Sequence, residues 1–364
     1  MLFTSCISFL QNGRHIGLTR FLCRQNFESS VKILIDNPEP FLLAHGGFQT
    51  QIEQTRQALI ECGLEVDFLR WWDPAQKGDV IHYFGRPFPA YVRAAHQKGL
   101  KVVFSPFHGE TGARSPWQLQ LQMAATRLGE SFVPSELRVR LAWETYRIAD
   151  ACIVLTSWEA HLVRYLFRAP SEKVHVVPNG VEKVFSPVPG VLRSQWLVTT
   201  GTIRPMKRPL ETAKAAIEAQ TPYWLIGKPY AESDSYYQQW IALCRAYPQW
   251  LRYEGSVENR AELAAIYQQA RGFVLLSEWE SLSLSAMEAA ACGCPLLLSD
   301  LPWARSAFGT AASYCPVTGL RTTARLLRAF YDQAPALPPP PQPKDWIAVG
   351  QMLKGIYESV CGTS

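Results

Sequence analysis

Residues 276–295, LSEWESLSLSAMEAAACGCP, contain the pattern that decides the fold. They begin inside an apolar run, 271–277, whose length and composition predict a buried parallel strand. Residues 285–291 have the Ala, Met and Glu content of a helix. A strand, a Ser-rich turn and a helix in this order place Glu280 before the helix and Glu288 within its first turns.

This junction offers chemistry for a phosphorylated sugar ligand. The start of a helix has free backbone N–H groups and a positive dipole end, and both attract an anionic phosphate. A carboxylate accepts two hydroxyl hydrogen bonds at once, so Glu288 could hold a ribose diol and Glu280 the hydroxyls of a hexose. Taken alone, an E-x7-E pair is better explained as two glutamates that complement a helix dipole, so the context has to decide.

Cations follow the end of another predicted strand, in residues 201–209, GTIRPMKRP. Gly201 ends the strand, and Arg204, Lys207 and Arg208 come after it. Arg offers a planar fork of donors and Lys a compact point charge, so the two together predict a clamp for a diphosphate. The alternative is a solvated turn with no ligand.

Residues 276–295 resemble the signature of the retaining glycosyltransferases of family four, roughly S-x-x-E-G-F-G-L-x-x-x-E-A-M-A-x-G-x-P. The matching residues are Ser277, Glu280, Leu284, Glu288, Ala289, Gly293 and Pro295. Further segments resemble the family in the same order: GGFQTQIEQTRQALIECGLEVDFL, ADACIVLTSWEAHLVRYLF, VHVVPNGVEKVFSP and TTGTIRPMKRPLETAKAA. The resemblance covers about residues 31 to 361, and the chain is identified as a member of this family.

The absence of a DxD-type metal motif near a strand end fits a metal-independent enzyme, and the resemblance implies a transferase that needs no cofactor. It would move a hexosyl group, with retention, from a nucleoside diphosphate sugar linked to UDP or GDP to a hydroxyl of a glycan, a lipid-linked sugar or a small molecule. Glu280 would hold the donor sugar and Glu288 the ribose, while Lys207 and Arg204 would stabilise the leaving diphosphate. His108, in SPFHGE, matches a position near the transferred sugar. The backbone expected around the donor comprises Gly46, Gly47, Gly201, Ser281, Leu282, Ser283 and Leu284.

Two departures from the family pattern keep other functions open. Thr202 stands where the family has an Arg after the glycine, and Arg204 is the candidate substitute. Ser281 and Ser283 replace two glycines, and a serine at a position that needs positive φ would be strained by roughly 1 kcal/mol. A weak or silent nucleotide-sugar-binding protein is therefore the main alternative. An epimerase of the same architecture is the lesser one, because the E-x7-E signature argues against it.

The order of elements predicts the α/β fold called GT-B, in which two Rossmann-like domains with parallel sheets face each other across a cleft. Short β-branched runs alternate with helical patterns from Val31 onward, as in doubly wound sheets. The expected strands are 31–36, 65–69, 79–84, 101–106 and 151–156, then 196–201, 223–228, 251–257, 272–277 and 295–300. Expected helices include 51–62, 90–98 and 136–148.

The expected domain boundaries follow the turn-rich and Pro-rich stretches of the chain. They are a poorly packed extension at 1–30, an acceptor-side domain at 31–186, a nucleotide-sugar-binding domain at 187–334, a linker at 335–345 and a helix in 346–364 that returns to the first domain.

Composition fits a two-domain globular enzyme of 364 residues, with 48% hydrophobic and 18% charged residues. The net charge of +5 has no dense Lys/Arg block, which argues against nucleic-acid binding and weakly for anionic ligands. Nine cysteines without a CxxC pair predict no metal site and reduced thiols in the cytoplasm. No apolar run reaches membrane-spanning length, so any membrane contact would be peripheral, at the inner face. Polysaccharide biosynthesis for the cell envelope is the expected setting.

Aromatic residues are plentiful, with 12 Trp in the chain. Most are expected in the core, because aromatic side chains supply large buried surfaces. Trp71, Trp72, Trp117 and Trp158 are candidates to stack on sugar faces.

Overall fold

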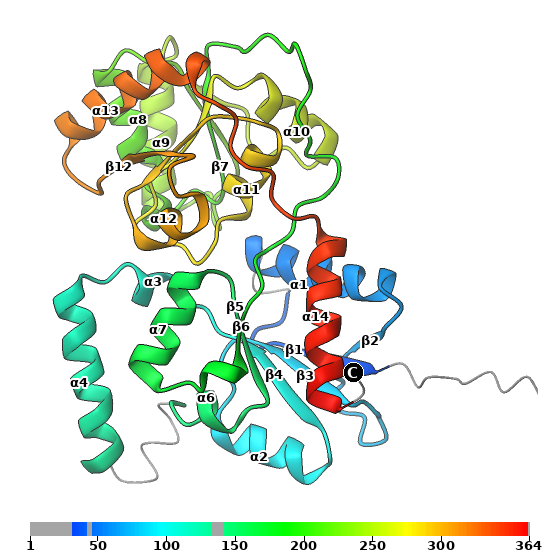
Figure 1. Ribbon diagram of the computed structural model, residues 1–364. Helices are drawn as coiled ribbons and strands as arrows, with labels where there is room; N and C mark the ends of the chain where they lie inside the picture. Colours follow the sequence, from blue (N-terminus) through cyan, green and yellow to red (C-terminus); the bar gives the residue numbers. More distant parts are fainter. Residues whose placement is uncertain (1–30, 42–45, 133–141, 363–364) are drawn as a thin grey trace, which may run out of the picture. The chain divides into compact units, whose positions relative to one another are not determined.

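The computed structural model describes residues 31–41, 46–132 and 142–362 (Figure 1). The extension expected at 1–30 lies outside these residues. The described chain forms two six-stranded sheets, with strand orders β2-β1-β3-β4-β5-β6 and β12-β11-β10-β7-β8-β9. Every strand pair in both sheets is parallel, which confirms the predicted doubly wound α/β class.

The first sheet has its reversal of strand order next to β1. The chain runs from β1 to β2 on one side and then returns to the other side of β1 as β3. Open α/β sheets bind ligands at such a reversal, called the topological switch point. The strands are β1 Lys32–Asp36, β2 Glu65–Phe68, β3 Val80–Phe84, β4 Lys101–Ser105, β5 Ala151–Val154 and β6 Val174–Val176. The helices are α1 Gly47–Glu61, α2 Pro89–Gln97, α3 Gly109–Gly112, α4 Pro116–Phe132, α6 Thr145–Ile148, α7 Ser157–Phe167 and η1 Ser171–Lys173.

The second sheet reverses its order between β7 and β10, which are neighbours although two strands of the sheet, β8 and β9, separate them in the chain. Its strands are β7 Leu197–Thr200, β8 Tyr223–Ile226, β9 Leu251–Tyr253, β10 Gly272–Leu275, β11 Leu296–Ser299 and β12 Ser313–Cys315. Its helices are η2 Pro205–Lys207, α8 Pro209–Glu218, α9 Ser235–Ala246, α10 Arg260–Gln269, α11 Leu284–Ala291, α12 Pro302–Phe308, α13 Leu320–Gln333 and η3 Ala334–Ala336.

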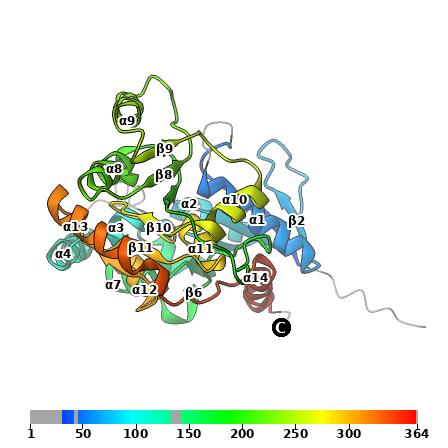
Figure 2. The same ribbon diagram turned by 90° about the horizontal axis from the view of Figure 1, so that it is seen from above.

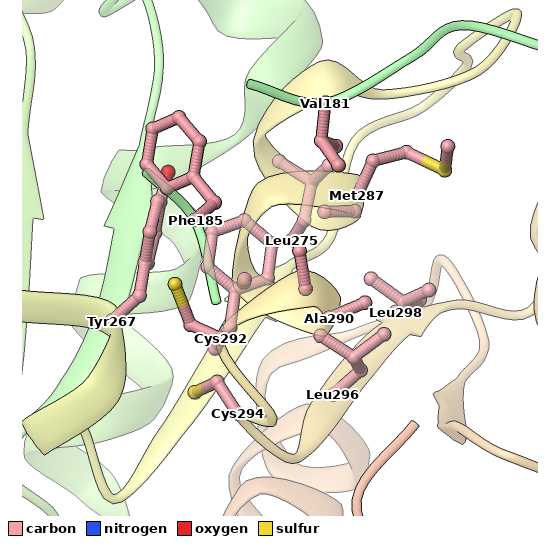
Figure 3. Packing of buried hydrophobic residues seen from close by; sticks show 14 of the residues in the cluster. Val181, Phe185, Tyr267, Leu275, Met287, Ala290, Cys292, Cys294, Leu296 and Leu298 are labelled. Atoms are coloured by element: carbon pink, nitrogen blue, oxygen red, sulfur yellow. The ribbon is translucent and has the colours of Figure 1, made fainter. Parts of the chain in front are cut away.

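Small side chains bring α11 close to the second sheet. Ala289, Ala290 and Ala291 are completely buried, and Leu275, Leu296 and Leu298 of β10 and β11 belong to the same core cluster (Figure 3). Cys292 and Cys294 end this cluster at the turn after the helix. Burial raises the pKa of both thiols to about 12, so they are small apolar groups of the core rather than reactive thiols.

The helix α14, Trp346–Cys361, packs against α1 of the first sheet (Figures 1 and 2). Gly350 permits this approach, because a Cβ atom there would lie 2.9 Å from the carbonyl oxygen of Ala58. Lys354 Nζ donates to the carbonyl of Cys62 at 3.1 Å, and the Tyr357 hydroxyl lies 2.7 Å from His82 Nδ1. The helix thereby covers part of the first sheet's core.

Four elements differ, in whole or in part, from the sequence prediction. The short edge strands β6 and β12 and the long helix α4 were not predicted. The helix expected at 136–148 is confirmed only at its end, where α6 covers 145–148; residues 142–144 are not helical, and Ala142 has a left-handed φ of 51°. The rest of that prediction falls on residues outside the described ranges. No helix in the described part of the chain is long and apolar enough to cross a membrane.

Candidate active site

Glu280 and Lys207 meet at the switch point of the second sheet. Glu280 follows β10 and Lys207 lies on η2, which follows β7, so the two neighbouring strands deliver their carboxyl ends to one place. Lys207 Nζ forms an ion pair with Glu280 Oε1, and Ser277 Oγ donates to the same oxygen at 2.8 Å. The two side chains remain 20% and 11% exposed, so solvent still reaches the pair. Two of the predicted catalytic residues are therefore in contact.

Hydrogen bonds to the main chain hold the loops that carry this pair. The backbone N–H of Glu278 donates to the carbonyl of Met206 at 2.9 Å, which ties the loop after β10 to the loop after β7. Ser299 Oγ donates to the carbonyl of Ser277 at 2.6 Å and fixes the other side of the turn. The ion pair thus lies in a frame of three adjoining strand ends.

The predicted anion site at the start of α11 has the expected local structure. Ser283 is the N-cap residue, and its hydroxyl accepts from the N–H of Ala286 at 3.3 Å. No acidic side chain lies in the first turn of the helix. The strain considered for Ser281 and Ser283 is absent, because neither is among the described non-glycine residues with positive φ. The buried Leu282 is held through its carbonyl, which accepts from Asn179 Nδ2 at 3.3 Å.

The glycine loop before α1 touches both parts of this site. A Cβ atom on Gly46 would lie 3.8 Å from Thr202 Oγ1, and one on Gly47 would lie 3.7 Å from Leu284 Cδ1. Gly46 has a φ of 115°, which favours glycine. These contacts bring together the predicted residues Gly46, Gly47 and Leu284. A fourth predicted residue, Gly201, directly precedes Thr202 in the chain.

His108 directly precedes Gly109, whose backbone lies close to the loop that carries Glu280. A Cβ atom on Gly109 would lie 2.8 Å from the Trp279 ring and 3.0 Å from the carbonyl carbon of Glu280. The His108 ring is buried, with Nε2 2.9 Å from the Tyr146 hydroxyl. Burial, together with the nearby charge of Arg86, lowers the pKa of His108 to about 3, so the imidazole is neutral at neutral pH.

Glu288 is buried inside a charged cluster that the sequence did not reveal. Arg260 Nη2 donates to Glu288 Oε1 at 2.5 Å, and Arg260 Nε donates to Glu182 Oε2 at 2.5 Å. The Tyr267 hydroxyl donates to the other oxygen of Glu288 at 3.3 Å. Burial raises the pKa of Glu288, and the charge of Arg260 opposes that shift. Arg260 lies outside the segments that resemble the family, and Glu182 lies inside one but was not singled out, so only their position in the fold identifies them.

Arg204 does not join the Lys207–Glu280 pair. Its Nη1 lies 3.5 Å from the Tyr230 hydroxyl, and its guanidinium carbon lies 5.8 Å from the centre of that ring. The third cation of this loop, Arg208, donates to the carbonyl of Thr318 at 3.3 Å. In the described ranges, no three His, Cys, Asp or Glu side chains gather as metal ligands would.

Two family models match this chain. Residues 53–180 match the model described as "Glycosyl transferase 4-like domain", and residues 201–320 match the one described as "Glycosyl transferases group 1". The two matches fall on the first and the second sheet, in that order. No curated protein sequence matches the chain.

Three of the solved structures that resemble this chain share its fold. Sucrose-phosphate synthase from Thermosynechococcus elongatus is 18% identical with a TM-score of 0.64, over 92% of this chain and 100% of that one. HepE from Anabaena, in complex with UDP, is 14% identical with a TM-score of 0.63, over 92% and 99%. The pneumococcal O-GlcNAc transferase GtfA, in complex with UDP and GlcNAc, is 16% identical with a TM-score of 0.54, over 78% and 57%. At these identities the likeness concerns the fold, which is GT-B.

Proposed function

The chain belongs to the group 1 glycosyltransferases, and from this premise we propose that it transfers a hexosyl group from a nucleoside diphosphate sugar to an acceptor hydroxyl, with retention of configuration. The observation that carries the proposal is the Lys207–Glu280 ion pair at the switch point of the second sheet. The pair combines a cation for a phosphate with a carboxylate for sugar hydroxyls, at the edge where parallel sheets bind ligands.

The ion pair gives each residue a partner until the donor arrives. On binding, the diphosphate takes over Lys207, and the free carboxylate of Glu280 accepts hydroxyl hydrogen bonds from the hexose. Negative charge then grows on the leaving diphosphate as the bond to the anomeric carbon breaks. Lys207 and the first N–H groups of α11 oppose that charge, so they bind the transition state more strongly than the bound donor.

The proposed transfer balances without any further reagent. The bond between the anomeric carbon and the phosphate oxygen breaks, and a bond to the acceptor oxygen forms on the same face of the sugar. The acceptor proton passes to the departing phosphate oxygen. No step in this sequence needs a metal or a cofactor, and the proposal includes neither.

The cluster of Glu182, Arg260 and Glu288 would hold the ribose end of the donor. Arg260 holds Glu288 in place, and the carboxylate has lone pairs left for a ribose hydroxyl. UDP is the first nucleotide to test, because HepE and GtfA are solved with it. GDP is the second. The proposed setting is assembly of cell-envelope polysaccharide at the inner face of the membrane, with a glycan or lipid-linked acceptor.

A thermal-shift series on the full chain tests the donor proposal. UDP, GDP, ADP and their common sugar conjugates are added in EDTA, because a ligand that binds only the folded state raises Tm. A shift with one conjugate identifies the donor. NMR of the product formed with that donor then reports the anomeric configuration. An inverted product would contradict retention, and absence of any shift would contradict donor binding.

Arg204 gives the rival proposal its one supporting observation. The Arg204 side chain contacts Tyr230, and position 202 is a threonine. The second cation expected beside Lys207 at the diphosphate therefore does not lie next to the Lys207–Glu280 pair. A nucleotide-sugar-binding protein without transferase activity would have this feature. A parent that transfers sugar, compared with a Glu280→Ala variant that binds nucleotide but transfers none, would exclude the rival.

A further inference from the structure

The first sheet has a pocket on the β2 side of β1 that the donor proposal does not use. The pocket has a volume of about 410 Å³ and lies at the carboxyl ends of β1 and β2. Its wall includes Asp36, Phe41, Phe68, Trp71 and two prolines, and none of the described residues that line it is basic. Its volume falls within the range of small-molecule sites. We call it the β1 pocket.

Asp36 gives the β1 pocket a buried carboxylate. Its side chain is almost fully buried at the end of β1. It accepts hydrogen bonds from the Tyr91 hydroxyl at 2.5 Å, from the N–H of Asn37 at 2.9 Å and from Trp71 Nε1 at 3.3 Å. A carboxylate has about four lone-pair positions, so one further donor can be accommodated. The hydroxyl of a ligand in the pocket is a donor of the right kind.

Trp71 gives the pocket an exposed aromatic wall in a defined position. The residue is 77% exposed, yet its indole N–H is bonded to the buried Asp36. Phe41 and Phe68, which also line the pocket, pack edge to face with ring centres 5.9 Å apart. An exposed ring that is already held in place binds a flat apolar surface with little loss of side-chain entropy.

We propose that the β1 pocket binds a neutral pyranose unit of the acceptor, with its C–H face on Trp71 and a hydroxyl on Asp36. A pyranose combines an apolar face with hydroxyl donors at its edge, and these match the ring and the carboxylate. The described part of the pocket wall offers no cation to a phosphate, which favours a neutral sugar over a charged one. The assignment to the acceptor rests on the proposed function.

The position along the chain connects the β1 pocket to the proposed donor site. Phe41 lines the pocket, and Gly46, five residues later, lies against Thr202. Five residues span at most about 18 Å, so the pocket and the donor loop are within the reach of a short oligosaccharide. The acceptor unit in the pocket would then be a few sugar units from the hydroxyl that reacts.

The neighbouring tryptophan provides a matched control. Trp72 is 79% exposed, close to the 77% of Trp71, but it does not line the pocket. Saturation-transfer-difference NMR on the full chain would use methyl glucopyranosides, methyl galactopyranosides and methyl mannopyranosides as probes, with glycerol as the control polyol. At least one methyl pyranoside should receive saturation, and glycerol should not. The Kd for that probe should rise about tenfold or more in Trp71→Ala and stay unchanged in Trp72→Ala.

Asp36→Asn supplies a second variant that keeps the shape of the side chain. It should also weaken the methyl pyranoside, because one oxygen acceptor becomes a donor. Equal affinity in Trp71→Ala and Trp72→Ala, or no saturation of any pyranoside, would overturn the pocket. If Trp71→Ala fails to fold by its melting curve, Trp71→Phe replaces it and should lose part of the binding.

The pyranoside experiment can fail or succeed independently of the test for nucleotide-sugar binding. The methyl pyranosides are tested without nucleotide, and UDP or GDP binding is read from Tm in the same variants. A Trp71→Ala protein that loses the pyranoside but keeps the nucleotide shift supports two distinct sites. Pyranoside binding without any shift of Tm by a nucleotide would support the pocket proposal and contradict the donor proposal.

Discussion

The two sheets are both parallel and doubly wound, but they differ in strand order and in the chemistry of the strand ends next to their reversals. In the second sheet the ends of β7 and β10 hold a cation and a carboxylate in an ion pair, Lys207 and Glu280. In the first sheet the end of β1 holds the carboxylate of Asp36 among neutral donors and aromatic rings. On the two proposals made above, parallel strands supply the place of each site, and the loop side chains select an anionic or a neutral ligand.

The largest effect is expected from Glu280→Gln in the charged site. The amide keeps the size of the side chain but loses the negative charge that faces Lys207, and it accepts fewer sugar hydroxyls. Turnover with the donor should fall about 10³-fold, equivalent to about 4 kcal/mol of transition-state stabilisation. The exposed neighbour Glu278→Gln is the control and should keep the parent rate. Parent-like turnover in Glu280→Gln would remove Glu280 from the site.

A smaller loss should follow from Lys207→Met. The first N–H groups of α11 remain to face the diphosphate, so turnover should fall about 10²-fold, or about 3 kcal/mol. Steady-state kinetics with the donor identified by thermal shift measures this loss. Lys214→Met, at an exposed position on α8, is the matched control. If both variants kept the same rate, the comparison of a charged with a neutral site would fail.

The neutral character of the first sheet can be tested through pH. Burial lowers the pKa of His82 to about 3, and its ring nitrogens lie 2.8 Å from Ser105 Oγ and 2.7 Å from the Tyr357 hydroxyl. Since the unfolded chain binds a proton below pH 6.5 and the folded chain does not, stability is lost as pH falls. Between pH 7 and pH 5 this residue contributes about 2 kcal/mol of that loss.

His82→Gln should reduce the pH dependence by that amount. Urea unfolding at pH 7, 6 and 5 would show a smaller difference in free energy between the extremes than in the parent. His161→Gln, at an exposed position of α7, is the control. A slope identical to that of the parent in His82→Gln would mean that the buried imidazole is charged in the folded protein.

The smallest expected effect is a difference in salt dependence between the two sites. The nucleotide binds through charge, so its Kd should rise several-fold between 50 and 500 mM NaCl, or about 1 kcal/mol. The Kd of a methyl pyranoside in the β1 pocket should not change, because no charge is neutralised there. Titrations of each ligand at both salt concentrations measure this. A parallel loss in both would show that the two sites share one electrostatic field.

Local patterns predicted the elements whose signal lies within a few residues of sequence. Glu280 and Lys207 were found because each follows a recognisable strand within a family motif. The pairs Arg260 with Glu288 and Tyr91 with Asp36 were not, because their partners are 28 and 55 residues apart and meet only after the sheets form. The edge strands β6 and β12 have three residues each, too few for a periodic pattern. In α4 several glutamines separate the apolar residues, which weakens the helical signal.

Because α14 is synthesised after both sheets, it affects the order in which the two sheets can fold. Residues 346–361 cover α1 and bond to His82, so the first sheet lacks part of its core until they leave the ribosome. The strands and helices of the second sheet, Leu197 to Gln333, have all been made by then. During translation the second sheet can therefore complete its core first, although the strands of the first sheet are synthesised before it.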